Sequence, residues 1–315
     1  MMTTNPATTP NRRRRPRDWI RTPEARFALA LMAPAAIFLL VFVAWPVIRL
    51  VFDSFYDVEF LHPADRTFVG LANYIEAFGS DSVRGAAART AAYTAIALSF
   101  ELLLGFGAAI LFNAFGKRSE IPRTIFAFPL MIAPVVAGLL WRFLLIDGFG
   151  IVNELLARVG ILNSPGDISW LSNPDIVLFS VAIPDIWLTS AFVMLITYAG
   201  LQNIPQELIE AARVDGARAS QIFRRVTLPL LRPVLAVVLI IRGIDAARAF
   251  DVILIQTEGG PQSASEVLSL QIYRTMVRFG DLGEASAIAT LFLVAMLVLA
   301  LVAYRTIWRP GTLES

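Results

Sequence analysis

Four charged residues recur at every third position inside a strongly apolar stretch, residues 231–256. They are Arg242, Asp245, Arg248 and Asp251. Charges inside a membrane span are costly, so they normally face a cavity or a partner of opposite charge. Because two charges of each sign sum to zero, this stripe is suited to lining a path for a neutral, hydroxyl-rich solute. The alternative is a structural role, in which ion pairs hold the segment against Glu101 or Asp185 on other spans.

A second charged stretch, EAARVDGARASQIFRRVTLP at residues 210–229, also lies between two apolar runs. Pro205 is well placed to begin a helix over 206–214, which Asp215 and Gly216 would end. A second helix is expected from Ala217 to just before Pro229, with an apolar edge at Ile222, Phe223 and Val226. The small side chains of Ala211 and Ala212 would let the first helix lie close against another protein. The alternative is an amphipathic loop on the bilayer surface.

The elements that must position these residues are membrane-spanning helices. Hydrophobic residues make up 57% of the 315 and charged residues 17%, and the mean hydropathy is +0.65, which indicates an all-α integral membrane protein. The absence of Cys and the single histidine, His62, exclude disulfides and His/Cys metal clusters. Six stretches are long and apolar enough to span: residues 27–52, 87–115, 123–145, 175–202, 231–256 and 284–307. Two small-xxx-small patterns, Gly105–Ala109 and Ala133–Ala137, predict close helix contacts.

The distribution of basic residues predicts the orientation of these spans. Counting from the first tail, 17 Arg and Lys fall on one side of the membrane and five on the other. Because basic residues favour the cytoplasmic side, both termini and the 203–230 loop are expected in the cytoplasm. Residues 1–26 then form an Arg-rich tail, an anchor beside the first span in preference to a nucleic-acid site or a cleaved signal peptide. Residues 308–315 form a second cytoplasmic tail.

The 210–229 stretch closely resembles the EAA loop of ABC importer permeases. Its matching residues are Glu210, Ala211, Ala212, Gly216, Val226, Leu228 and Pro229. The resemblance implies a MetI-like bundle in which the helix around Glu210, Asp215 and Gly216 inserts into a separate ATP-hydrolysing subunit. The chain has no G-x-x-x-x-G-K-[ST] phosphate loop. It is therefore expected to be a non-catalytic subunit with no cofactor of its own, while ATP and Mg bind the partner ATPase.

The segment Thr257-Glu258-Gly259-Gly260-Pro261 and the span before it resemble carbohydrate importer permeases of the maltose-transport type. That resemblance implies cargo contacts from two spans, which are Asp185, Leu188, Thr189, Phe192, Asp245 and Ala249, with Arg242 and Arg248 on the same path. Asp185 replaces an amide of the family pattern, Thr189 a Gly and Phe192 a Tyr, so the sugar can differ. Within the family the chain most resembles the trehalose-importing branch of mycobacteria, which implies a disaccharide cargo, trehalose.

The resemblance also implies partners. They are a second homologous permease, two ATP-binding cassette subunits and an extracytoplasmic solute-binding lipoprotein, assembled in the bacterial plasma membrane for alternating access, with no nucleic acid. Three other functions remain open. The first is an ABC permease for another cargo, such as a glycerophosphodiester, oligosaccharide, amino acid or peptide. The second is an ion-driven secondary carrier, although the inverted repeats expected of one are not visible. The third is a structural scaffold.

Overall fold

The structure is a computed structural model that describes residues 23–307. Residues 1–22 of the tail expected at 1–26, and the tail expected at 308–315, lie outside the described residues, while residues 23–26 belong to a helix. The chain divides into two units, residues 1–52 and 53–315. The described part of the first unit is helical, with α2 (Pro23–Leu39), the π-helical turn η1 (Leu40–Ala44) and α3 (Trp45–Asp53). The π turn ends at Ala44, two residues before Pro46, which has no backbone N–H to continue a regular helix.

The core of the second unit is the pair α5 (Asp81–Phe115) and α9 (Val177–Gln202). These helices pack along most of their length because small residues let their backbones approach. A Cβ atom added to Gly105 would lie 2.5 Å from the Ser190 carbonyl oxygen and 2.6 Å from Val193 Cβ, closer than atoms can pack. The close contact predicted at Gly105–Ala109 is therefore confirmed.

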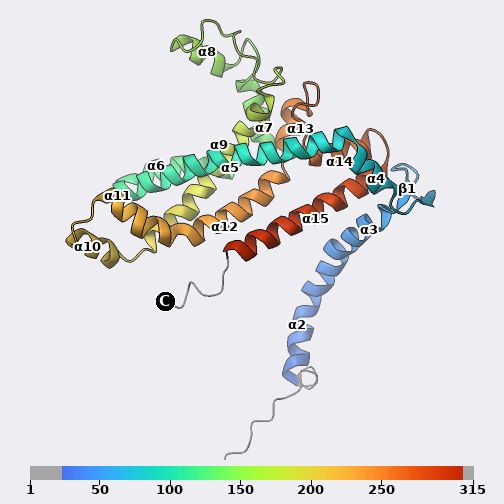
Figure 1. Cartoon of the computed structure of the whole chain (residues 1–315), viewed down its shortest axis with the longest axis horizontal. Helices are drawn as coiled ribbons and strands as arrows, with labels where there is room; N and C mark the ends of the chain where they lie inside the picture. The colour runs from blue at the N-terminus through green and yellow to red at the C-terminus, as the bar shows by residue number, and fades with distance from the viewer. Residues whose placement is uncertain (1–22, 308–315) are drawn as a thin grey trace, which may run out of the picture. The chain divides into compact units, whose positions relative to one another are not determined.

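Two further long helices, α12 (Leu228–Ala247) and α15 (Leu282–Ile307), lie beside this pair (Figure 1). Two clusters of buried side chains fill the bundle. One joins α5 and α9 to α13 (Asp251–Thr257) and α14 (Leu268–Val277) through Tyr93, Ile186 and Ile253. The other joins α5, α9 and α12 through Phe112, Met194 and Leu231. On α5, Glu101 falls between the two clusters, so the charged residue sits in the middle of the bundle.

The third predicted span is not one continuous helix, which corrects the expectation for 123–145. It is built from α6 (Glu120–Ala127), the 3-10 turn η3 (Phe128–Met131) and α7 (Pro134–Leu144), with Ile132 and Ala133 extended. Pro129 is the second residue of the 3-10 turn and Pro134 begins α7, and proline at each point interrupts the helical hydrogen bonds. Within the described residues, five helices are long and apolar enough to cross a membrane, and α7 is a shorter apolar helix.

The fifth predicted span, residues 231–256, is also interrupted. α12 ends at Ala247, and α13 begins at Asp251 after Phe250 adopts φ −141° and ψ −61°. Neither proline nor glycine lies at this break. Instead, α13 leaves the line of α12 and packs chiefly against α7, where the Arg142 guanidinium donates to the Ile255 carbonyl at 2.9 Å. The expectation of one continuous span over 231–256 was therefore wrong, and Asp251 lies on a different helix from Arg242 and Asp245.

The helix expected at 206–214 is α10 (Gln206–Val214), and Gly216 after it has φ +77°. The second helix of this hairpin does not end before Pro229 as predicted. α11 (Ala219–Ile222), the π turn η4 (Phe223–Thr227) and α12 form one continuous helix over Ala219–Ala247. Pro229 lies in the first turn of α12, directly after the π turn η4. The wider π turn accommodates the lack of a backbone N–H on this proline.

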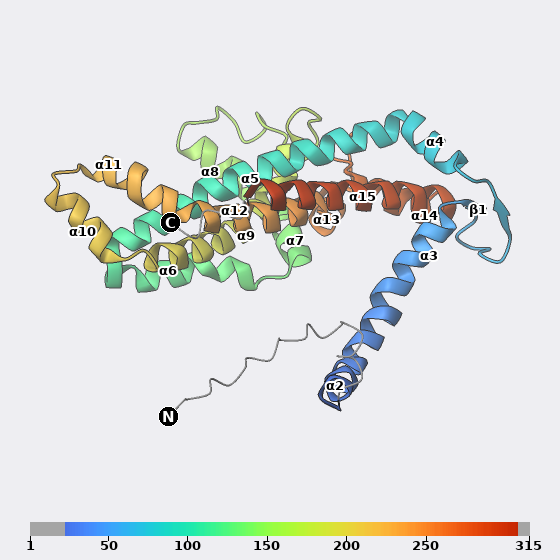
Figure 2. The same ribbon diagram turned by 60° about the horizontal axis from the view of Figure 1, so that its bottom comes forward.

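The other end of the second unit carries shorter elements (Figure 2). They are the antiparallel strands β1 (Tyr56–Val58) and β2 (Arg66–Phe68), α4 (Ala72–Gly79) and α14, while α8 (Ile151–Arg158) lies apart from them, beyond α7 in Figure 1. Tyr56 pairs with Phe68 and Val58 with Arg66. α10 lies at the opposite end of the bundle from β1, α4 and α14 in both views. The two ends are therefore separate surfaces, joined by the long helices.

Candidate functional site

Three helices bring charged side chains together in the middle of the bundle. Arg242 on α12 donates from Nε and Nη2 to the two oxygens of Glu101 on α5, each at 2.8 Å. The same Nη2 lies 3.3 Å from both oxygens of Asp185 on α9. The Glu101 side chain is fully buried and that of Arg242 is 7% exposed. A forked guanidinium–carboxylate contact of this length is a strong charge-assisted interaction.

Asp185 is the member of this group that remains open. Its side chain is 16% exposed, and its contacts are longer than those of Glu101. The Tyr93 hydroxyl on α5 donates to Asp185 Oδ2 at 3.3 Å, while the Thr189 hydroxyl donates to the Asp185 backbone carbonyl at 2.5 Å. An ionised carboxylate has about four acceptor positions. Asp185 can therefore accept further hydrogen bonds from a solute.

The rim of the group is formed by the end of α12. Asp245 Oδ2 lies 3.7 Å from Arg242 Nη1, and Asp245 Oδ1 accepts from Arg248 Nη2 at 2.8 Å. Their side chains are 45% and 60% exposed. The expected contact between neighbouring Arg and Asp on this segment is thus present. The expected balance of charge is not, because the group contains two arginines and three carboxylates: Arg242, Arg248, Glu101, Asp185 and Asp245.

The remaining residues of the expected cargo path differ in accessibility. Thr189 and Phe192 on α9 and Ala249 after α12 are half-buried. Leu188 is 4% exposed and belongs to the packed interior. Tyr93 was not anticipated, because a tyrosine in an apolar run has no charge to draw notice. Glu101 was considered only as a possible ion-pair partner, although a glutamate within an apolar span is itself a signal.

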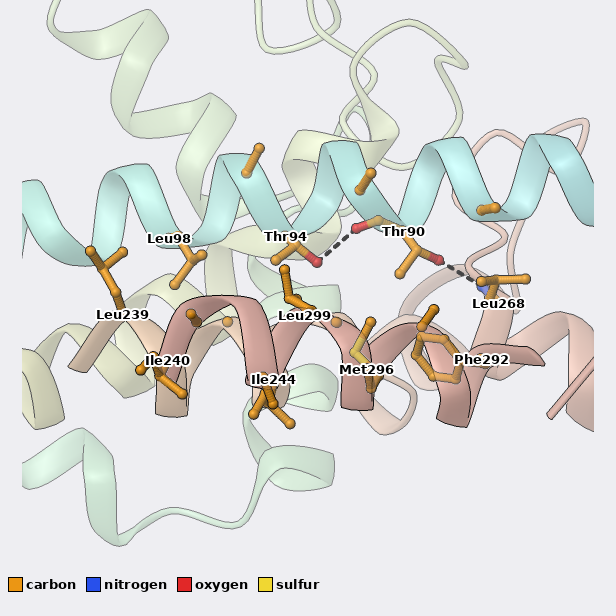
Figure 3. A pocket seen from close by; sticks show the side chains of 18 residues that line it. Thr90, Thr94, Leu98, Leu239, Ile240, Ile244, Leu268, Phe292, Met296 and Leu299 are labelled. Carbon is orange, nitrogen blue, oxygen red and sulfur yellow. Dashed lines mark hydrogen bonds between the residues drawn. The ribbon is translucent and has the colours of Figure 1, made fainter. Parts of the chain in front are cut away.

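A hollow of about 610 Å³ lies between α5, α12 and α15 and is apolar (Figure 3). The polar side chains that line it are Thr90 and Thr94. Both hydroxyls donate to carbonyls of α5, Thr90 to Ala86 at 2.8 Å and Thr94 to Thr90 at 2.7 Å. Thr90 also accepts from the Leu268 N–H. With its hydroxyl donors occupied and its walls apolar, this hollow is unsuited to a hydroxyl-rich solute.

The expected coupling residues lie in the exposed hairpin at the end of the bundle. Glu210, Ala211, Asp215 and Gly216 are exposed, Ala212 is half-buried, and Val214 is 88% exposed. Within residues 23–307, no ion pair is recorded for Glu210 or Asp215. An exposed surface with apolar and acidic side chains is suited to a protein partner.

The hairpin is nevertheless attached firmly to the bundle. Ile209 of α10 packs against the cluster that contains Phe112, Met194 and Leu231 from three long helices. The Phe223 ring lies 6.2 Å from that of Phe106 on α5. Leu228 and Pro229 are half-buried in the continuous helix. A force on α10 would therefore reach α5, α9 and α12 directly.

The Thr257–Pro261 segment forms a tightly bonded loop between α13 and α14. Arg274 bonds both the Glu266 carboxylate and the Glu258 carbonyl, and Arg278 pairs with Glu258 at 2.8 Å. Gly259 has φ +87°, and a Cβ there would lie 2.8 Å from Leu270 Cδ2. Only glycine fits this position without strain. In the described part of the chain, no three His, Cys, Asp or Glu side chains are grouped to hold a metal ion.

Comparisons with known proteins place this geometry in a family. Residues 101–310 match the family described as "Binding-protein-dependent transport system inner membrane component". The chain is 35% identical to the trehalose/maltose transport system permease protein MalF of Thermococcus litoralis, covering 89% of this chain and 92% of that protein. It is 34% identical to the sulfoquinovosyl glycerol transport system permease protein SmoG of Agrobacterium fabrum, covering 90% and 91%.

A solved structure shares the fold. It is a bacterial ABC transporter involved in the import of the acidic polysaccharide alginate, with a TM-score of 0.80 at 24% sequence identity over 94% of this chain and all of the matched chain. The family match covers about two thirds of the 315 residues, and both sequence relatives exceed 30% identity. The chain therefore belongs to the inner membrane components of binding-protein-dependent transport systems, the permease subunits of ABC importers.

Proposed function

We propose that this chain forms half of the path by which an ATP-driven importer moves a neutral disaccharide, trehalose, across the membrane. The observation that carries the cargo class is Asp185, a partly exposed carboxylate with free acceptor positions in the middle of the bundle. Sugar hydroxyls are donors that such a group binds well. The named cargo of the Thermococcus relative, trehalose or maltose, supports a disaccharide.

We further propose that the α10 hairpin transmits the energy of ATP hydrolysis to the spans. Its exposed face around Glu210, Ala211 and Asp215 would occupy a cleft in an ATP-binding cassette subunit. The packing of Ile209 against the α5–α9–α12 cluster supports this role, because it links the exposed face to the path. Two such subunits, with ATP and Mg bound to them, would drive alternating access.

The complete importer would contain a second homologous permease and an extracytoplasmic solute-binding lipoprotein. The lipoprotein would dock at the end of the bundle that carries β1, α4 and α14. This arrangement requires the bacterial plasma membrane, six spans and both termini on the cytoplasmic side, with α10 there also. The excess of Arg and Lys on that side supports the orientation.

A second candidate cargo is a glycosylated glycerol. The Agrobacterium relative transports sulfoquinovosyl glycerol by its name and is nearly as similar as the Thermococcus protein. A glycerophosphodiester is chemically similar, because it too is a glycerol joined to a second group. Both cargoes retain the importer architecture and differ only in what the central site must bind.

The test is ATPase activity of the reconstituted importer with its binding protein, measured against disaccharides, glycosyl glycerols and glycerophosphodiesters. Trehalose alone should stimulate hydrolysis. Asp185→Asn should weaken the response to trehalose, whereas Asp251→Asn, an exposed aspartate that begins α13, serves as the matched control and should preserve it. Stimulation by another class of solute would replace the cargo, and no response to any sugar would refute the carbohydrate assignment.

A further inference from the structure

Arg242 lies between two carboxylates that it does not bind equally. It forks onto Glu101 with two hydrogen bonds of 2.8 Å. Its contacts with Asp185 are both 3.3 Å and come from one nitrogen that Glu101 already shares. Hydrogen bonds of a charged nitrogen weaken over this range, so the guanidinium is committed mainly to Glu101.

This asymmetry determines where the unmatched charge of the site lies. Glu101 is fully buried and neutralises Arg242, while Asp245 pairs with Arg248 at the rim. Three carboxylates against two arginines leave one negative charge, and it falls on Asp185. The other side-chain donor to Asp185 is Tyr93, which is neutral. Asp185, which is 16% exposed, is thus the carboxylate that carries the surplus charge.

We propose that Glu101 is a positioning residue that acts on the cargo through Arg242. By occupying most of the guanidinium, it leaves acceptor positions on the Asp185 oxygens for solute hydroxyls and leaves the site negative. The site then favours a neutral solute over an anionic one. This inference rests on the proposed function, since it concerns the same path.

Removal of Glu101 should reverse both effects. The fork of Arg242 would be free to turn onto Asp185, since the two groups are already 3.3 Å apart. A bidentate Arg242–Asp185 pair would fill the acceptor positions that a sugar needs and would cancel the surplus charge. Binding of a neutral disaccharide would weaken, and binding of an anionic one would strengthen.

The experiment measures equilibrium binding to the complete transporter in lipid nanodiscs. The two solutes are trehalose and a disaccharide of the same size that carries a uronate carboxylate. Wild type should prefer trehalose, and Glu101→Gln should reduce that preference by about tenfold, as expected when a unit charge close to the ligand is cancelled. Both affinities are read on one preparation, so a loss of folded protein does not alter their ratio.

A double variant separates positioning from mere support of the fold. Glu101→Gln with Arg242→Gln removes both charges of the buried pair, which is less disruptive than removing one. No guanidinium is then left to turn onto Asp185, so the preference for trehalose should return to within about threefold of wild type, against a tenfold loss in the single variant. A purely structural role for Glu101 predicts no such recovery.

The matched control is Glu266→Gln. Glu266 is also buried, at 3% exposure, and is also paired with an arginine, Arg274, but it lies in the loop before α14. Its removal should leave the preference at the wild-type value. The inference is overturned if Glu101→Gln binds trehalose with an unchanged preference, or if the double variant does not recover. A wild-type transporter that binds no neutral disaccharide would refute the proposed function itself.

Discussion

The central site and the α10 hairpin contain the same types of charged residue, but these residues differ in burial and in ion pairing. In the middle of the bundle, Arg242 is held by two carboxylates and is almost fully buried. At the end of the bundle, Glu210 and Asp215 are exposed and have no recorded ion pair within residues 23–307. The first group completes its interactions inside the chain, and the second leaves them for a partner.

This difference teaches how burial sorts the roles of charged residues in a permease. A charge buried among helices must be paired, so removing one member of the pair mainly lowers the free energy of unfolding. A charge on an exposed hairpin contributes little to stability, so its removal mainly weakens binding to another subunit. The following variants test whether the two regions separate in this way.

The largest effect on stability is expected from Arg242→Met. Glu101 would remain fully buried without its partner, which costs about 3–5 kcal/mol of the free energy of unfolding. The measurement is the thermal unfolding midpoint of the purified protein in detergent. Arg248→Met is the control, because its side chain is 60% exposed and should cost about 1 kcal/mol or less. Equal midpoints for the two variants would contradict the contrast between buried and exposed charge.

Glu210→Lys should leave the unfolding midpoint unchanged and strongly reduce import. Reversing the charge on the exposed face of α10 places a like charge where a complementary one is expected, so transport should fall at least about tenfold. The readout is uptake by proteoliposomes of the complete importer. Glu120→Lys reverses an exposed glutamate on α6 and should transport normally. Normal uptake by Glu210→Lys would show that α10 is not a coupling element.

Gly216→Val tests whether the hairpin depends on backbone conformation as well as on charge. Gly216 has φ +77°, and a β-branched residue there costs about 1–2 kcal/mol of local stability. We expect faster proteolysis of the hairpin and weaker stimulation of the ATPase. Gly216→Asn, which tolerates this conformation better, should behave more like wild type. Indistinguishable proteolysis of the two variants would rule out a conformational requirement.

The smallest effect concerns salt. The Asp245–Arg248 pair is exposed on both sides, so its contribution to stability should vanish when sodium chloride is raised to about 1 M. The buried Arg242–Glu101 pair should be insensitive, because salt does not reach it. The measurement is the midpoint difference between each variant and wild type at low and high salt. A salt-dependent Arg242→Met difference would show that water reaches the buried pair.

The features that depend on a local sequence pattern could be predicted from the sequence. The hairpin was recognisable because Pro205, Glu210 and Gly216 stand at fixed offsets, and the long helices because apolar residues fill them. The break after Ala247 was not, because no proline or glycine marks it and it depends on α13 packing against α7. The central site was only partly predictable, since Glu101, Asp185 and Arg242 are joined by helix packing across 141 residues of chain. Tyr93 carried no signal at all.

Because α11, η4 and α12 form one continuous helix, a rotation at the hairpin also moves the far end of this helix. From Ile222 to Arg242 the helix rises about 30 Å, at about 1.5 Å for each residue. A tilt of about 5° at the hairpin would carry the far end of such a rod sideways by about 3 Å. The Arg242 Nη2 atom lies 2.8 Å from Glu101 and 3.3 Å from Asp185, a difference of 0.5 Å. The displacement of about 3 Å is larger than this difference. A small rotation of the hairpin is thus enough to change which carboxylate the arginine contacts.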